Sequence, residues 1–342
     1  MNSVVDMHLA DRLDLPEPYR ARGYRGREDH LAMTAVLAAY REVLGEQQVP
    51  TVEELDIGYA HLDDCDPETD IYVLEHGAGD VVGYGRASFE DLEHEGRNVR
   101  DCIVFAPTMP DHLHRPLFDA TVAGQEAHMR MWAAGVDDAR FRAYASHPGP
   151  GLPATGEAAW LEDHGYVATE WEASLVRPDL DDIPDRTLPD GVELRPVTTD
   201  QIRPILEAHF EAFRGEWDFK EATENDYAEM IDDPYRDESL WKIAWAGDTV
   251  VGQVKSYIRT DENAERGSLR GYTENIAVHH DWRNRGIAGA LLAMSLRELR
   301  DRGMTEASLG VDTNNPGGAF QLYTGLGFEL DAYSAVYTRP VG

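Results

Sequence analysis

Two neighbouring runs, Glu274-Asn275-Ile276-Ala277-Val278 and Trp282-Arg283-Asn284-Arg285-Gly286-Ile287-Ala288-Gly289-Ala290-Leu291-Leu292, decide the fold of this chain. The apolar residues 276–278, bounded by polar ones, predict a strand. Apolar residues then recur at helical spacing as far as Leu299 and stop before Gly303, which predicts a helix that ends at a glycine. A strand, a turn of small residues and a helix present several backbone N–H groups in one direction. The segment therefore predicts an anion-binding turn.

The residue types in this turn suit a pyrophosphate. Gly286 allows the backbone to turn sharply and approach a ligand closely. Ala288 leaves the following turn of the helix unobstructed, and Arg283 and Arg285 add positive charge. Many strand-to-helix turns with no ligand share these features, so the turn alone leaves both interpretations open.

The composition narrows the class of protein. A chain of 342 residues is long enough for two domains. It contains no apolar run of membrane-spanning length and no basic, apolar leader, so we expect a soluble cytoplasmic protein. The formal net charge of −33 and the lack of a basic stripe argue against nucleic acid or an anionic membrane as partner. The same charge would attract a cationic amine.

No metal site is expected from the sequence. The acidic run with Asp64, Asp66 and Glu68 lacks the turn glycine and the closing glutamate of a calcium loop. The pair His112 and His114 has no third ligand at a suitable spacing. With only two cysteines, a disulfide framework is not expected either.

The two halves of the chain resemble each other in three places that occur in the same order. Val81-Val82-Gly83 and Val250-Val251-Gly252 each follow a Gly-Asp turn. Segment 161–166 matches segment 323–328, and each ends in a glycine followed by an aromatic residue. Arg-Pro pairs follow at 177–178 and 339–340. The repeat predicts a duplicated fold, with domains 1–178 and 191–342 joined by an acidic, proline-containing linker at 179–190.

A second block, Asn314-Asn315-Pro316-Gly317-Gly318-Ala319-Phe320-Gln321-Leu322-Tyr323, leads to Gly327-Phe328. Together with the Arg-x-x-Gly-x-Ala turn and the Glu-Asn-Ile-Ala-Val strand, it resembles the GCN5-related N-acetyltransferase (GNAT) superfamily. The resemblance covers about 192–340 and is specific in 274–328. The two-copy layout is similar to mycothiol-synthase-like tandem acetyltransferases. The implied fold is α/β, with two tandem GNAT-like domains, each a mixed sheet flanked by helices.

The resemblance also implies roles for particular residues. Tyr323 would be the general acid that protonates the departing thiolate, and Glu274 would accept a proton from the acceptor ammonium. Two alternatives remain open, in which Tyr323 is a core aromatic and Glu274 faces solvent. The residues that would bind acetyl-CoA are Ile276, Ala277, Val278, Arg283, Asn284, Arg285, Gly286, Ile287, Ala288, Gly289, Asn315 and Phe320.

The first copy lacks the features of this site. When the two helix-ending glycines Gly135 and Gly303 are aligned, Phe118 stands opposite Gly286, and Pro116 removes a backbone donor. Leu161 stands opposite Tyr323. We therefore expect a degenerate first domain and a catalytic second domain.

The expected activity is transfer of the acetyl group of acetyl-CoA to a primary amine of a small molecule, by direct attack in a ternary complex. Aromatic residues interspersed with carboxylates at 213–241 favour a cationic or amino-sugar-like amine, although most of these aromatics could equally be core residues. Two rival functions remain: a non-catalytic acyl-CoA-binding or assembly protein, and an acetyltransferase that acts on protein amines. The chain could be a monomer or a homodimer.

Overall fold

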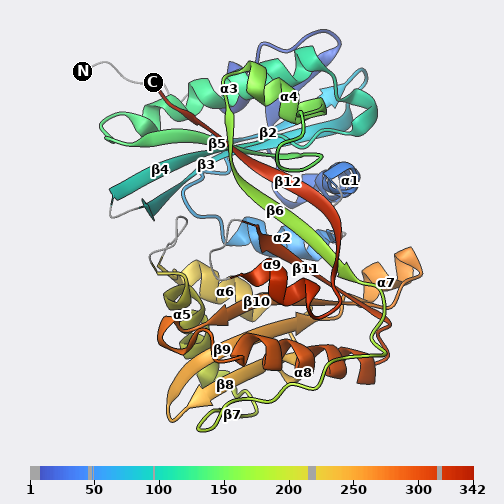
Figure 1. Cartoon of the computed structure of the whole chain (residues 1–342). Coiled ribbons are helices and arrows are strands. Elements are labelled where there is room, and N and C mark those ends of the chain that lie inside the picture. The colour runs from blue at the N-terminus through green and yellow to red at the C-terminus, as the bar shows by residue number, and fades with distance from the viewer. Residues whose placement is uncertain (1–7, 45–47, 49, 95–96, 215–220, 314–317) are drawn as a thin grey trace. The chain divides into compact units, whose positions relative to one another are not determined.

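The computed structural model describes residues 8–342 apart from 45–47, 49, 95–96, 215–220 and 314–317. The chain forms two compact units, the first made of the chain up to Trp171 with Tyr333–Gly342, and the second of Glu172–Ala332. The division runs through two strands, β6 (Val167–Arg177) and β12 (Glu329–Pro340), which are labelled in Figure 1. It does not fall in the predicted linker. The predicted ranges describe the two sequence copies, whereas each compact unit includes the last strand of the other copy.

The first unit has a mixed sheet in the order β1-β2-β3-β4-β5-β12, with the start of β6 beside β12. Strand β12 pairs antiparallel with β5 from Ser334 to Pro340. The other strands of this sheet are β1 (Tyr19–Gly23), β2 (Ile71–His76), β3 (Asp80–His94), β4 (Arg97–Phe105) and β5 (Ala139–Ser146). Its helices are α1 (Arg27–Leu44), α2 (Val52–Ala60), α3 (Arg115–Ala133) and α4 (Gly156–Asp163).

Strand β2 shows why helices cover both faces of this sheet. Successive side chains of a strand point to opposite faces. Tyr72 and Leu74 belong to the core cluster that contains the α3 residue Leu117. Val73, between them, belongs to the cluster that contains the α1 residue Met33. A strand that is apolar on both faces therefore requires a helical layer on each side.

The second unit has the sheet order β6-β11-β10-β9-β8-β7. Strand β11 runs parallel to β10 and antiparallel to the end of β6, and β9 runs antiparallel to both β8 and β10. The strands are β7 (Glu193–Leu194), β8 (Lys242–Ala246), β9 (Thr249–Tyr257), β10 (Arg270–Val278) and β11 (Glu306–Asp312). The helices are α5 (Ile202–Ala212), α6 (Glu224–Asp232), α7 (Thr260–Arg266), α8 (Ile287–Asp301) and α9 (Ala319–Thr324).

Strand β9 separates the two helical layers of this unit. A Cβ atom on Gly252 would lie 2.6 Å from Ile287 and 3.2 Å from Leu291, so this glycine allows α8 to pack directly on the strand. The next residue, Gln253, faces the other way and donates a hydrogen bond from Nε2 to the Ile205 carbonyl of α5 at 3.1 Å. One face of β9 therefore carries α8 and the other carries α5.

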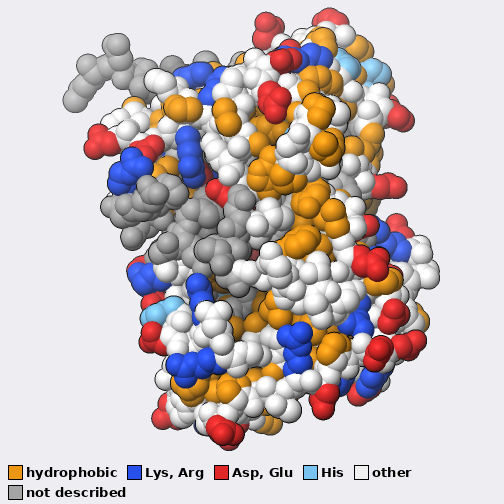
Figure 2. Space-filling model, in the orientation of Figure 1, with side chains coloured by type: hydrophobic (Ala, Val, Ile, Leu, Met, Phe, Trp, Pro, Cys, Tyr) orange, Lys and Arg blue, Asp and Glu red, His pale blue; other side chains and the backbone are white. Residues whose placement is uncertain are grey.

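The predicted fold class is confirmed: a mixed α/β sheet carries helices on its faces in both units. The Thr51 capping box opens α2, and the Thr198 box precedes α5. Within the described residues, no helix is long and apolar enough to cross a membrane. On the face drawn in Figure 2, Asp and Glu side chains are interspersed with Arg and Lys.

Candidate active site

The β9 and β10 strands separate at a bulge. Glu274 pairs with Lys255, but the register shifts before the next pair, Ala277 with Gln253. Asn275 lies in the bulge with a positive φ of 49°, a conformation that few residues other than glycine adopt. A bulge leaves one residue outside the ladder, so backbone groups here are available to a ligand.

The turn between β10 and α8 has the geometry of an anion site. Asn284 has a φ of 61° and Gly286 a φ of 80°, so two left-handed residues fold the chain back into the helix. Gly286 is the N-cap of α8, and no side chain caps this helix. The first N–H groups of a helix have no partner within the helix, and they carry its positive dipole end. These N–H groups are suited to bind an anion.

The turn opens into a cavity of about 290 Å³ in the second unit. Its walls come from the end of β10, the turn, the start of α8, the end of α5 and α9. The lining residues are Arg186, Ala212, Phe213, Ile276, Ala277, Val278, Trp282, Arg283, Asn284, Gly286, Ile287, Ala288, Gly289, Ala319, Leu322 and Tyr323. Most residues predicted from the sequence to bind acetyl-CoA are therefore brought together in one cavity.

Three predicted residues are not on the cavity wall, and a fourth belongs to a part of the chain that the structure does not describe. Arg285 donates from Nη2 to the Asp281 carbonyl at 2.9 Å and stacks on the Trp282 ring, and it is absent from the cavity wall. Phe320 in α9 and Glu274 in β10 are not lining residues either. Asn315 lies outside the described residues.

Arg283 has a different role from the one its charge suggested. Its guanidinium donates to the carbonyl oxygens of Val278 and Ala212. These bonds tie the turn to the end of strand β10 and to the end of helix α5. Much of its hydrogen-bonding capacity is thus used to hold the turn in shape.

Tyr323 lies on the cavity wall with its side chain largely buried. The residue is 5% exposed, and its ring centroid is 6.3 Å from that of Phe328. Burial raises the pKa of Tyr323 to about 12, because the phenolate would lose its hydration. The phenol therefore keeps its proton at every physiological pH and is suited to donate a hydrogen bond or a proton.

Sequence reasoning missed Arg186, which belongs to the acidic segment predicted as a linker. Its Nη1 atom lies 2.3 Å from where a Cβ on Gly289 would be, so the guanidinium lies directly on the first turn of α8. Gly289 is the signal that could have found it, because a glycine inside a helix leaves room for another group. Arg186 adds a positive charge beside the uncapped helix end.

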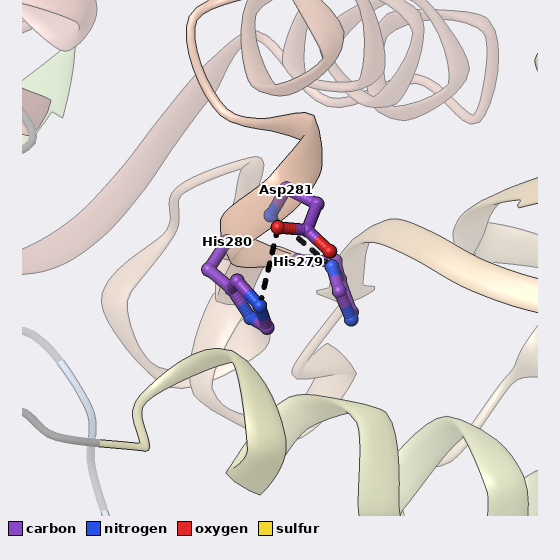
Figure 3. Close-up of side chains that lie close together, drawn as sticks. All are labelled: His279, His280 and Asp281. Atoms are coloured by element: carbon purple, nitrogen blue, oxygen red, sulfur yellow. Dashed lines mark hydrogen bonds and ion pairs between the residues drawn. The ribbon is translucent and has the colours of Figure 1, made fainter.

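Three consecutive residues at the start of the turn, His279, His280 and Asp281, lie close together (Figure 3). The Asp281 N–H donates to His279 Nδ1 at 3.3 Å, and the two imidazole rings stack at 4.3 Å. His280 and Asp281 are exposed. The contacts cap the short helical turn 280–282, and we assign them this structural role.

The corresponding turn in the first unit is filled. Helix α3 begins at Arg115, the position that aligns with Arg283, so the residues that would form the anion-binding turn are already helical. Arg115 is paired with Asp119 and Asp163. The Phe118 ring lies 5.3 Å from that of Trp160 and is 7% exposed. The residue that aligns with Gly286 is therefore a packed aromatic ring inside the helix.

The uncapped helix, the bulged strand and the shared cavity define a class of protein, and comparison with known proteins agrees. The "Acetyltransferase (GNAT) family" matches residues 202–328. A mycothiol acetyltransferase of Salinispora arenicola is 30% identical over 292 residues, covering 82% of this chain and 77% of that protein. The chain belongs to the GNAT family of acetyltransferases.

Among particular relatives, a mycothiol acetyltransferase of Thermobifida fusca is 28% identical and covers 69% of this chain and 73% of its own length. The crystal structure of a GCN5-related N-acetyltransferase from Sphaerobacter thermophilus superposes with a TM-score of 0.70 at 22% identity, covering 96% of this chain and 97% of that one. A tandem GNAT protein from the clavulanic acid biosynthesis pathway gives 0.66 at 16% identity, covering 95% and 98%. These two structures share the tandem fold with this chain.

Proposed function

We propose that this chain transfers the acetyl group of acetyl-CoA to a primary amine of a small molecule, at the cavity of the second unit. The observation that carries the proposal is the uncapped N-terminus of α8, which shares one cavity with the β10 bulge and the Tyr323 ring. The names of the mycothiol acetyltransferase relatives support a small-molecule acceptor.

Each part of the cavity has a role in the proposed binding of acetyl-CoA. The first N–H groups of α8 and the Arg186 guanidinium hold the pyrophosphate. The backbone at Ile276 and Ala277, beside the bulge, holds the pantetheine arm and the thioester carbonyl. Backbone donors at that carbonyl also stabilise the oxyanion that forms on attack.

The proposed reaction is direct attack in a ternary complex. The amine nitrogen bonds to the thioester carbon, and the C–S bond breaks as the tetrahedral intermediate collapses. Glu274 accepts the ammonium proton through water, and Tyr323 protonates the thiolate of CoA. The Tyr323 phenol, whose pKa is raised to about 12, is then reprotonated from solvent.

In this proposal the first unit contributes no second cofactor site. Arg115 and Phe118, which align with Arg283 and Gly286 in the sequence, are an ion-paired side chain and a packed ring. At the position of Tyr323, this unit has the buried aliphatic residue Leu161. It therefore lacks both the anion turn and the thiolate acid.

The test is release of CoA thiol from acetyl-CoA in the presence of a panel of small primary amines, compared with Tyr323→Phe. We expect turnover on at least one amine, and a fall in kcat of about 100-fold in the variant with an unchanged Kd for acetyl-CoA. The matched control is Tyr337→Phe, because Tyr337 is also buried and its hydroxyl has no partner among the described residues. Tight binding of acetyl-CoA without turnover on any amine would show a non-catalytic acyl-CoA-binding protein instead.

A further inference from the structure

Lys255 of β9 is a buried cation that forms no ion pair with a described residue, although Glu274 stands opposite it in β10. The residue is 1% exposed. Its Nζ donates to the Met230 thioether sulfur at 3.3 Å and lies 5.3 Å from the centre of the Trp241 ring. Neither group is an anion. An isolated buried ammonium costs folding free energy, and proteins retain such groups mostly where they serve a function.

The ammonium remains charged at neutral pH. Burial lowers the pKa of Lys255 to about 8, because the charged form is withdrawn from water. At pH 7 most molecules therefore still carry the proton. A negative group that entered this place would gain an ion pair without displacing another partner.

Two neutral polar groups beside Lys255 also lack partners. Gln253 lies two residues earlier on the same face of β9, and its Oε1 atom is buried without a hydrogen bond to any described residue. His209 lies one helical turn after Ile205, whose carbonyl accepts the Gln253 amide, and its buried Nδ1 is unpaired among the described residues as well. Burial and the Lys255 charge lower the pKa of His209 to about 3, so its ring is neutral.

The cluster lies near the cavity already described. Gln253 is the cross-strand partner of Ala277, which lines that cavity. Lys255 is two residues further along β9, about 7 Å at the rise of a strand. An acceptor whose nitrogen reacts beside Ala277 would therefore reach Lys255 with a functional group a few bonds away.

We propose that Lys255, with the His209 ring, binds a carboxylate of the acceptor, while Gln253 Oε1 accepts from a donor of the same ligand, so that the acceptor is an amine that also carries a carboxylate. This inference rests on the proposed acetyl transfer. One ammonium beside one neutral imidazole matches a monoanion, whereas a phosphate dianion would leave surplus negative charge in a buried site. Such an acceptor carries a carboxylate besides its ammonium, so it is not the purely cationic amine expected from the composition.

The cover over Lys255 is light enough to admit a ligand. Met230 belongs to α6, a helix of nine residues in which no side chain is fully buried. A methionine side chain is unbranched and changes rotamer readily. Met230 is partly buried against the core cluster that contains Trp241, so a ligand would displace a flexible side chain at the edge of that core.

The first copy has a cation at the same strand position. When Val81 is aligned with Val250, Arg86 stands opposite Lys255. The Arg86 guanidinium lies 5.8 Å from the Tyr59 ring and 5.9 Å from the Phe105 ring, and its Nε has no partner among the described residues. Among the described residues, the cation at this position forms no ion pair in either copy.

The experiment compares amines that carry a carboxylate with their carboxamide analogues of the same shape. For each pair, kcat/KM is measured with the full-length protein and with Lys255→Met. We expect the unmodified protein to prefer the carboxylate by about 10- to 100-fold, the value of a hydrogen bond to a charged group, and the variant to lose this preference. Lys255→Met should also raise the Tm, because it removes a buried unpaired charge, and this rise shows that the variant is folded.

The matched control is Lys242→Met, in the neighbouring strand β8, since Lys242 pairs with Glu298 at 3.1 Å. It should leave the carboxylate preference unchanged. Transfer to amines with no carboxylate preference, or a preference that survives Lys255→Met, would overturn the inference while leaving the acetyltransferase proposal intact. Absence of transfer to every amine would instead overturn the acetyltransferase proposal, and the inference with it.

Discussion

At the scale of single residues, the cavity combines small residues of the turn before α8 with Arg186, which comes from a distant part of the chain. Gly286 and Ala288 can be predicted from the sequence, because they are small residues within a periodic apolar pattern. Arg186 cannot be predicted in this way, because it lies 103 positions (289 − 186) before Gly289 along the chain. Only the tertiary fold brings its guanidinium onto α8. Gly289 shows that some group can pack on α8, but no local pattern identifies that group as Arg186.

Arg186 leads to a prediction about acetyl-CoA binding. Replacing Arg186 by Gln should weaken the binding of acetyl-CoA by about tenfold, because a charge-assisted hydrogen bond to the phosphates is lost. Equilibrium titration with acetyl-CoA measures this change, and high salt should narrow the gap between variant and parent. Arg195→Gln is the control, since Arg195 pairs with Glu193 and stacks on Trp245 away from the cavity. Equal Kd values for Arg186→Gln and the parent would show that Arg186 does not bind the phosphates of acetyl-CoA.

At the scale of elements, the strand, turn and helix of the site were predictable because every local feature agrees. The bulge in β10 was not. Asn275 has a positive φ, which its residue type tolerates but does not require. The register shift arises from the pairing of β10 with β9, and that pairing is not visible in either strand alone.

The turn before α8 allows a test that separates strain from ligand binding. Gly286 and Gly303 flank α8 with φ values of 80° and 91°, and neither would bring a Cβ within 4 Å of another atom. Alanine at either position should therefore lower stability by a similar amount, about 1 kcal/mol. Only Gly286→Ala should also weaken acetyl-CoA binding, by tenfold or more, because its methyl group stands where the phosphate approaches the backbone. Thermal unfolding and titration with acetyl-CoA measure the two effects, and equal loss of affinity in both variants would contradict this role.

At the scale of the whole chain, the two copies exchange their last strands in matching ways. Arg177 at the end of β6 donates to the Leu326 carbonyl beside Gly327, in the second unit. Arg339 at the end of β12 donates to the His164 carbonyl beside Gly165 at 2.7 Å, in the first unit. The Arg-Pro pairs are visible in the sequence. Their identical spacing, however, fits two arrangements equally well: each copy keeps its own last strand, or the two copies exchange β6 and β12. The domain limits could therefore not be read from the repeat.

The exchange predicts that a residue near the end of the chain stabilises the first unit. Arg339 forms an ion pair with Glu126 of α3, which is 4% exposed and also accepts from the Tyr166 hydroxyl at 2.9 Å. Arg339→Met leaves this buried carboxylate without its main partner, so we expect a loss of about 3 kcal/mol. Adding Glu126→Gln should restore part of the lost free energy of unfolding, because it removes the unpaired negative charge of the Glu126 carboxylate. Arg130→Met is the control: Arg130 contacts the same carboxylate at 3.4 Å from a half-exposed position, and its loss should cost less than about 1 kcal/mol.

Hydrogen exchange would locate the destabilisation caused by Arg339→Met. If β12 belongs to the first unit, amide protection should fall in α3, α4 and β5, whereas α8 and β9 keep theirs. Acetyl-CoA binding in the second unit should then persist at temperatures where the first unit has begun to open. Protection lost first in α8 and β9 would mean that the last strand stabilises its own copy, and the exchange of strands between the units would be disproved.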